Sequence, residues 1–458
     1  MHSPLRLFTI IFTALVALAV MSVCPWEKWT GGRLKNFNLL GDLLPAASAP
    51  ATDSAVADNL DPELAKLKDI VPSAPVDTLD AVIEIPADFK APTIDGTVLI
   101  EDYSPDHTGL ARLASTLDEG ASRRVRIAMV GDSYIEGDIL AQDIRASLQD
   151  MYGGCGVGYM AAFSHFPGFR HSVNQTSDNW TEHEIRKMKQ DDALRTILGT
   201  CYTATPGANV RFRGSVRPAH ADAWHRTSVV FIAPVDGTIT FTGVDNQTDV
   251  HTVEGSSEVQ CITLNSPTKD IRVSTDINGL QVLGIWLEGT YGIVLDDISL
   301  RGNSGISHRQ LNATTTASMR RYIDYDIIIL EFGMNALSAA QKDYTAYGAG
   351  MVEVVNNIKT LYPGAQIMIL GVGDRGHKSG TALGSMPTVT AMVKAQRDVA
   401  RQTGSLFWDT RAAMGGEGAA VEWHGRKLVN SDYVHLNHKG GKELADIFIK
   451  SLTTSLSR

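Results

Sequence analysis

Residues 325–452 of this 458-residue chain alternate between short apolar runs and longer segments with apolar residues at helical spacing. Three runs have the length of buried strands, at residues 325–330, 366–372 and 405–408. Three segments are long enough for helices, at residues 347–361, 386–403 and 438–452. Strands that alternate with helices predict a parallel sheet covered by helices on both faces.

A further strand and helix of the same kind stand far upstream, at residues 126–130 and 139–148. Between them and residue 325, from about 210 to 300, short segments of alternating polarity recur without helices. Turn signals such as Asp236-Gly237 and Asn278-Gly279 separate these segments. This pattern is typical of a β-sandwich. We therefore expect a doubly wound α/β domain with a β-sandwich inserted after its first strand and helix.

Residues 7–23 form an uncharged stretch of 17 residues near the N-terminus. This length is at the short end for a membrane span, and Trp26 and Trp29 just beyond it suit a membrane–water interface. A cleaved signal is the alternative, although no A-x-A site follows directly. We expect an uncleaved membrane anchor, with the bulk of the chain exported to the periplasm or cell exterior.

Residues 46–59 are rich in Ala, Pro, Ser and Asp, a composition typical of a flexible tether. Together these patterns predict five regions along the chain. They are an anchor and juxtamembrane segment at 1–45, a linker at 46–90, the first part of the α/β domain at 91–195, the inserted β-sandwich at 196–295, and the second part of the α/β domain at 296–458.

The net charge is -10 and no long basic run occurs, which argues against nucleic acid as a partner. Cys24, Cys155, Cys201 and Cys261 show neither a CxxC motif nor the Cys/His spacing of a zinc site. We expect no metal and no cofactor. Cys24 adjoins the apolar segment, which leaves at most one disulfide among the other three cysteines.

In an open parallel sheet, ligands bind at the carboxyl ends of the strands. Gly131-Asp132-Ser133 stands between the first strand and the first helix, where a serine hydroxyl is exposed and the helix N-terminus favours developing negative charge. Seen alone, Asp132 and Ser133 are equally well explained as helix caps. The tripeptide by itself is weak support for a site, and its position is what makes it a candidate.

Later strand ends supply the other parts of an acyl-transfer site. Asn335 follows the strand at residues 327–332, and Asp432 and His435 lie between the last strand and the last helix. Each residue has a structural alternative in a turn. Taken together, however, they offer a base, an acid that orients it and a neutral donor for an oxyanion, beside the nucleophile Ser133.

The order Gly-Asp-Ser, Gly, Gly-x-Asn, Asp-x-x-His resembles the SGNH, or GDSL-type, esterases and acyltransferases over about residues 125–190 and 292–452. The resemblance implies a flavodoxin-like sheet, with Ser133 as nucleophile, His435 as its base and Asp432 as the orienting acid. It also implies an oxyanion hole made by the Ser133 N–H, a glycine N–H and the Asn335 side chain. We place that glycine at Gly305, with Gly302 as the alternative.

The insertion between the serine and glycine blocks resembles that of peptidoglycan O-acetylesterases, which carry a carbohydrate-module-like sandwich there. This resemblance implies a serine esterase that removes O-acetyl groups from an exported polysaccharide, peptidoglycan in the first place, through an acetyl-Ser133 intermediate. Trp224 is our candidate for stacking on a sugar ring, and a core position is its alternative. An O-acetyltransferase with the same residues and a non-catalytic glycan-binding protein are the other functions left open.

Overall fold

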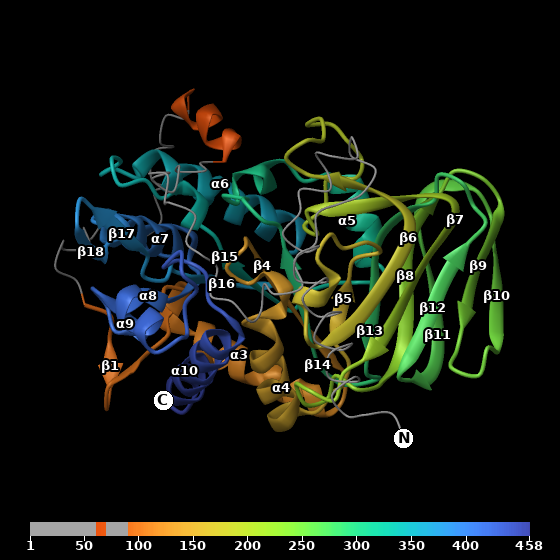
Figure 1. Cartoon of the computed structure of the whole chain (residues 1–458), viewed down its shortest axis with the longest axis horizontal. Coiled ribbons are helices and arrows are strands. Elements are labelled where there is room, and N and C mark those ends of the chain that lie inside the picture. Colours follow the sequence, from red (N-terminus) through yellow and green to blue (C-terminus); the bar gives the residue numbers. More distant parts are fainter. Residues whose placement is uncertain (1–60, 70–89) are drawn as a thin grey trace, which may run out of the picture. The chain divides into compact units, whose positions relative to one another are not determined.

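The computed structural model of the chain describes residues 61–69 and 90–458 (Figure 1). The predicted anchor at residues 7–23 and most of the predicted linker lie outside these residues. Within the described ranges, no helix is long and apolar enough to cross a membrane. The first described element is the short 3₁₀ helix Pro62–Asp69.

A six-stranded sheet forms the centre of the α/β part. Its order is β14-β4-β15-β16-β19-β3, and only the pair of β19 with β3 is antiparallel. The strands are β3 (Glu101–Asp102), β4 (Arg124–Gly131), β14 (Gly292–Ser299), β15 (Ile327–Glu331), β16 (Gln366–Leu370) and β19 (Leu406–Trp408). In chain order the five parallel strands run 2-1-3-4-5, which is the flavodoxin-like order. The doubly wound sheet is therefore confirmed, with an antiparallel edge strand that we did not predict.

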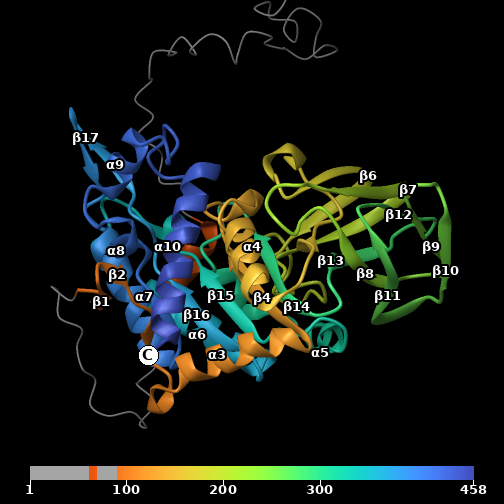
Figure 2. The same ribbon diagram turned by 90° about the horizontal axis from the view of Figure 1, so that it is seen from below.

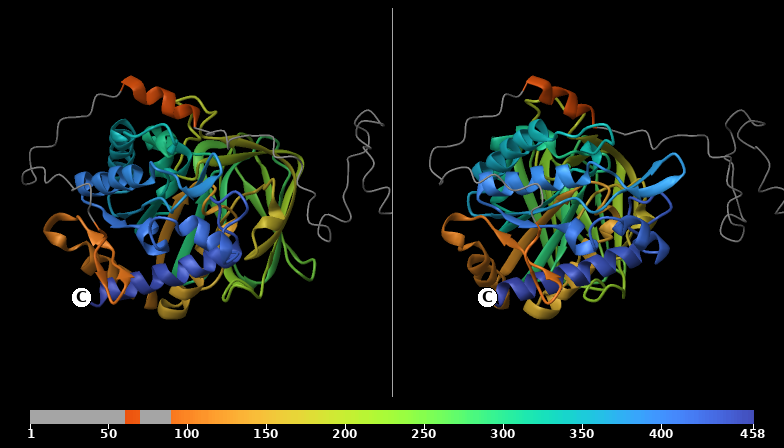
Figure 3. Two further views of the ribbon diagram at one scale, coloured as in Figure 1. Left: turned by 60° about the vertical axis from the view of Figure 1, so that its left-hand side comes forward. Right: turned by 90° about the vertical axis from the view of Figure 1, so that its left-hand side faces the viewer.

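Helices cover both faces of this sheet, which is why β15 and β16 are buried along their whole length. Helix α10 contacts α3 and α4, whereas α6 contacts α5 and α7. Figure 2 shows α4 and α10 in front of the sheet, and Figure 3 shows α10 and α6 on opposite sides of it. The helices are α3 (Gly109–Asp118), α4 (Ala141–Tyr152), α5 (Ala313–Arg320), α6 (Thr345–Leu361), α7 (Val389–Thr403), α8 (Thr410–Met414), α9 (Ala419–Gly425) and α10 (His438–Leu456).

The chain between α4 and β14 forms the predicted insertion, an antiparallel sheet of nine strands around its own apolar core. Seven strands follow the order β10-β9-β12-β7-β13-β8-β11, while β5 pairs with β13 and β6 with β7. The strands are β5 (Gly158–Met160), β6 (Val173–Glu184), β7 (Thr200–Gly214), β8 (Trp224–Ala233), β9 (Gly237–Thr242), β10 (Thr248–Val253), β11 (Ser256–Thr268), β12 (Asp270–Thr275) and β13 (Gln281–Glu288).

The insertion is one continuous sheet rather than the two separate sheets of a sandwich. The physical reason is the length of β7, whose 15 residues pair with β13 near its start and with β12 near its end. The insertion also begins and ends earlier than the expected range 196–295. It begins before residue 196 with β5 and β6, and it ends before Gly292, where β14 of the parallel sheet begins.

Strand β13 joins the insertion to the α/β part because its side chains enter two cores. Leu283 and Trp286 are buried in the core of the α/β part, whereas Ile285 and Leu287 are buried in the core of the insertion. The short hairpin β17 (Gly376–Ser379) and β18 (Ala382–Ser385) lies outside both sheets. Its first residue contacts the loop that carries His435, as described below.

Candidate active site

The nucleophile loop follows directly from the end of β4. Gly131 leaves no room for a side chain, since a Cβ there would lie 2.6 Å from the carbonyl oxygen of Glu331 on β15. Asp132 is buried, and its Oδ1 accepts the N–H of Tyr134 at 2.8 Å. This local hydrogen bond closes a tight turn and leaves Ser133 partly exposed.

The structure brings the three predicted catalytic residues together. The Oγ of Ser133 lies 2.9 Å from Nε2 of His435, and Nδ1 of His435 lies 2.7 Å from Oδ2 of Asp432. Partial burial raises the pKa of Asp432, but hydrogen bonds from the His435 ring and from the N–H groups of Val434 and His435 outweigh it and lower this pKa to about 2. Asp432 is therefore ionised at neutral pH and can orient the imidazole and stabilise its cation.

The loop that carries Asp432 and His435 is held from two sides. The N–H of Asn430 donates to the carbonyl oxygen of His435, and the N–H of Gly376 on β17 donates to that of Tyr433, both at 2.8 Å. Tyr433 has a φ of 59°, which turns the chain between the acid and the base. Asn437 then caps α10 by accepting two backbone N–H groups.

Two backbone N–H groups, in the loops after β4 and β14, are candidates for the oxyanion hole. The N–H groups of Ser133 and Gly302 have no hydrogen-bond partner among the described residues. The N–H of Gly305, in contrast, donates to Oδ1 of Asn303 at 3.0 Å, and Gly305 is buried against Phe332. The choice between the two glycines stays a prediction, and Gly302 is the stronger candidate because the Gly305 N–H already donates within its own loop.

Asn335 lies beside the nucleophile loop, as expected. Its Nδ2 donates to Oδ2 of Asp132 at 2.7 Å and makes a longer contact of 3.3 Å with the carbonyl oxygen of Asn303. Gly333, with a φ of 113°, turns the chain from β15 into this position. The structure thus connects the serine, glycine and asparagine blocks, while the role of Asn335 as an oxyanion donor stays a prediction.

Sequence reasoning missed a buried carboxyl group under the nucleophile loop. Glu331, the last residue of β15, is 2% exposed. Burial and the nearby Asp132 carboxylate raise the pKa of Glu331 well above its usual range, and burial raises the pKa of Asp132 to about 7. A glutamate at the end of an otherwise apolar strand is the sequence signal for this group.

Asp61, in the predicted linker, was missed as well. It is 2% exposed, and its Oδ2 accepts both the N–H and the hydroxyl of Ser304 at 2.8 Å. Its own N–H donates to the carbonyl oxygen of Asn335 at 3.3 Å. Asp61 therefore braces two of the loops that surround Ser133, and nothing in its sequence surroundings indicated this.

Trp224 does not bind sugar, contrary to our expectation. It is fully buried at the start of β8, in the core of the insertion. Its indole N–H donates to Oγ1 of Thr227 at 2.8 Å. The ring is therefore packed and its N–H is hydrogen-bonded inside the fold.

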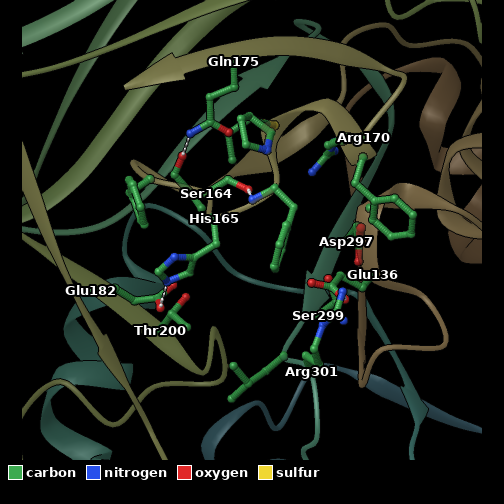
Figure 4. Close-up of a pocket in the computed structure, with 18 of the residues that line it drawn as sticks. Glu136, Ser164, His165, Arg170, Gln175, Glu182, Thr200, Asp297, Ser299 and Arg301 are labelled. Atoms are coloured by element: carbon green, nitrogen blue, oxygen red, sulfur yellow. Dashed lines mark hydrogen bonds and ion pairs between the residues drawn. The ribbon is translucent and has the colours of Figure 1, made fainter. Parts of the chain in front are cut away.

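A cavity of about 380 Å³ lies between the insertion and the parallel sheet (Figure 4). Its lining includes Glu136, three residues after Ser133, and Arg301, the neighbour of Gly302. Among the described residues, no three His, Cys, Asp or Glu side chains converge as metal ligands do. The cysteines 155, 201 and 261 are free thiols.

A doubly wound sheet with a Ser–His–Asp triad at its strand ends defines a serine hydrolase. In agreement, residues 280–442 match the GDSL-like Lipase/Acylhydrolase family. This match confirms the resemblance predicted from the motifs, and together with the triad geometry it identifies a serine esterase. Among curated proteins, none matches the chain by sequence.

Solved structures show where the fold recurs. A peptidoglycan O-acetylesterase aligns with a TM-score of 0.65 at 20% identity, covering 78% of this chain and 99% of its own. A family two carbohydrate esterase from Cellvibrio japonicus aligns with a TM-score of 0.27 at 11% identity, covering 61% of this chain and 99% of its own. The first likeness shows the same fold, and the second is too distant to support an argument.

Proposed function

We propose that this serine esterase removes O-acetyl groups from an exported polysaccharide, peptidoglycan in the first place, through an acetyl-Ser133 intermediate. The proposal depends on one observation, the two hydrogen bonds that link Ser133 to His435 and His435 to Asp432. This arrangement activates a serine for attack on an ester. The shared fold with a peptidoglycan O-acetylesterase supports the choice of a glycan acetyl ester.

The first half of the reaction forms the acetyl-enzyme. As Oγ of Ser133 attacks the acetyl carbonyl carbon, its proton moves to Nε2 of His435, and Asp432 stabilises the resulting imidazolium. The N–H groups of Ser133 and Gly302 and the Asn335 amide hold the tetrahedral oxyanion. The bond to the sugar oxygen then breaks, and that oxygen leaves with the proton from His435.

The second half releases acetate. Water attacks the carbonyl carbon of acetyl-Ser133 while its proton moves to Nε2 of His435. The bond to Oγ breaks when the second tetrahedral oxyanion collapses, and His435 returns the proton to Ser133. A sugar hydroxyl in place of this water would give the O-acetyltransferase alternative, because the same residues serve both reactions.

Acetate release from O-acetylated peptidoglycan by the purified full chain tests the proposal. We expect free acetate as the main product, and Ser133→Ala to lower the rate at least about 1,000-fold. Esterase activity that survives in Ser133→Ala would contradict the catalytic assignment. A chitooligosaccharide acceptor added to the same assay distinguishes the transferase, which would form an acetylated acceptor at the expense of free acetate.

The cellular placement is a separate proposal. The apolar stretch at residues 7–23 and the two tryptophans after it support a membrane anchor, with the esterase on the periplasmic or outer side. Fractionation of cells that express the full chain should recover it with the membrane and accessible to added protease from that side. Recovery in the cytoplasmic fraction would contradict this placement.

A further inference from the structure

The cavity beside the active site lies between two parts of the fold that are far apart in sequence. Figure 4 shows polar side chains on opposite sides of an open space. His165, Glu182 and Thr200 come from the insertion, and Glu136, Asp297 and Arg301 come from the α/β part. A ligand in this space would contact both parts at once. Its volume of about 380 Å³ falls within the range of small-molecule sites, about 300–1,000 Å³.

The charges that line the cavity balance one another. Four carboxylates and four Lys or Arg side chains line it, so their formal charges cancel, and several of them form ion pairs. His165 Nε2 lies 3.1 Å from Glu182, and Arg301 lies 2.7 Å from Glu136. Such a lining offers many hydrogen-bond donors and acceptors without net charge. It suits an uncharged ligand with many hydroxyl groups better than an anionic or a fatty one.

Asp297 adds a polar group that the protein itself leaves without a partner. Its side chain lines the cavity, and the residue is 4% exposed. Oδ2 accepts the N–H of Asp138 at 2.8 Å, but Oδ1 has no hydrogen-bond partner among the described residues. Burial raises the pKa of Asp297 to about 7, and its unpartnered oxygen is shielded by the surrounding residues rather than open to the cavity.

Aromatic surface is available in the same cavity. Phe166, in the loop between β5 and β6, lines it and is 57% exposed. The guanidinium of Arg301 lies 5.1 Å from the centroid of the Phe166 ring. An exposed ring beside paired charges is the combination by which a site can hold the apolar face of a pyranose while hydrogen bonds take its hydroxyls.

The cavity also shares two loops with the candidate active site. The Arg301–Glu136 ion pair joins the loop after β14 to the loop after β4, and these two loops contain Gly302 and Ser133. The cavity therefore borders both of these loops, although Ser133 and Gly302 themselves do not line it. The ion pair would transmit the fit of a bound sugar to the two backbone donors of the oxyanion hole.

We infer that this cavity is a saccharide subsite that binds an uncharged pyranose of the glycan next to the acetylated one. The side chains of Arg301, Glu182 and His165 bind its hydroxyl groups, and Phe166 contacts its ring. The inference rests on the proposed function, because it assumes that Ser133 acts on a glycan ester. It adds that the enzyme recognises a chain of sugars and that the insertion supplies half of the recognition.

Two substrates of different size test the subsite by kinetics. An O-acetylated chitotetraose offers sugar rings that can fill the cavity, whereas p-nitrophenyl acetate carries no sugar for the cavity to bind. For Phe166→Ala and for Glu182→Gln we expect the ratio of kcat/KM on the tetrasaccharide to kcat/KM on p-nitrophenyl acetate to fall at least tenfold, mainly through KM. Tyr322→Ala is the matched control, since Tyr322 is 42% exposed beside Arg321 and is not part of the lining. A ratio within threefold of the wild type for both cavity variants would overturn the inference.

A binding experiment separates failure of the subsite from failure of the proposed function. Unacetylated chitotetraose and cellotetraose are titrated calorimetrically into Ser133→Ala protein, which needs no turnover. We expect at least one of them to bind, and at least tenfold more weakly when Phe166→Ala is added. No binding by either, or equal binding with Phe166→Ala, would overturn the subsite even if the esterase is active. Binding without any esterase activity in the wild type would overturn the proposed function alone.

Discussion

The side-chain amide of Asn335 donates a 2.7 Å hydrogen bond to the carboxylate of Asp132 and so ties the loop after β15 to the loop that carries Ser133. Asp132 at the same time accepts the N–H of Tyr134. The nucleophile therefore stands on a turn whose geometry depends on two neighbouring strands.

Replacing Asn335 tests this connection and the oxyanion role together. We expect Asn335→Ala to lower kcat about 100- to 1,000-fold with a small change in KM, because the lost donor acts on charge that develops in the transition state. Steady-state kinetics with p-nitrophenyl acetate measure this. Asn356→Ala, on the exposed face of α6, is the control. A kcat within fivefold of the wild type would remove Asn335 from the oxyanion hole.

The two glycines of the second block should respond differently to alanine. In Gly305→Ala the new Cβ would lie 2.9 Å from the Phe332 ring at a φ of 90°. We expect the free energy of unfolding to fall by about 2–4 kcal/mol. In Gly302→Ala the new Cβ would lie 3.0 Å from the far end of the flexible Arg186 side chain, so we expect a loss of only about 1–2 kcal/mol from the positive φ. Its kcat should fall about tenfold or more through displacement of the donor. Urea denaturation and kinetics on both variants check this, and the opposite pattern would restore Gly305.

Asp432 should matter for catalysis and for acid stability. Asp432→Asn should lower kcat on the order of 10,000-fold, because the amide favours the wrong tautomer of His435. The pKa of Asp432 is lowered to about 2, so its contribution to stability is present above its unfolded pKa of about 3.9 and is lost as the pH falls through about 2.

Melting temperatures of the wild type and Asp432→Asn across this pH range test the second point. The wild type should be the more stable at pH 7, and the difference should shrink steadily as the pH falls from about 4 to about 2. A difference that stays constant over this range would show that the Asp432 carboxylate is not stabilised in the fold.

For Glu331 we expect the contribution to stability to depend on pH in the opposite direction. Because its folded pKa is raised, its contribution to stability is fully present below its unfolded pKa and is lost as the pH rises. We therefore expect Glu331→Gln to gain stability relative to the wild type between pH 5 and pH 8, by at most about 1.4 kcal/mol per pH unit. Urea denaturation at both pH values measures the gain. Glu417→Gln, at an exposed position, should show none.

Trp224 should behave as a core residue. We expect Trp224→Ala to lower the free energy of unfolding by about 3–5 kcal/mol, because it leaves a large cavity at the start of β8. Trp224→Phe should keep most of the stability and all of the affinity for chitotetraose. A specific loss of glycan binding in the stable Phe variant would show that the predicted sugar contact exists after all.

The strand–helix order, the insertion and the three triad residues followed from the sequence, because each depends on short-range patterns. Ile327–Leu330 has the apolar run of a buried strand, and Ser133, Asp432 and His435 each stand at a predicted strand end. Parallel strands all place these ends at one edge of the sheet, so their proximity could be expected before any contact was known.

The tertiary structure decided which neighbouring groups these residues meet. Whether Gly302 or Gly305 offers its N–H depends on where the Asn303 side chain points. Whether Trp224 is exposed depends on the packing of the insertion around its own core. Asp61 reaches Ser304 across 243 positions of the chain, and Glu331 comes under Gly131 only through strand pairing. Such contacts are set by packing between distant segments, which no local pattern encodes. The sequence by itself therefore predicted the nucleophile, its base and the sheet that holds them, and the fold determined the hydrogen-bond partners of the neighbouring loops, the buried carboxyls and the cavity beside them.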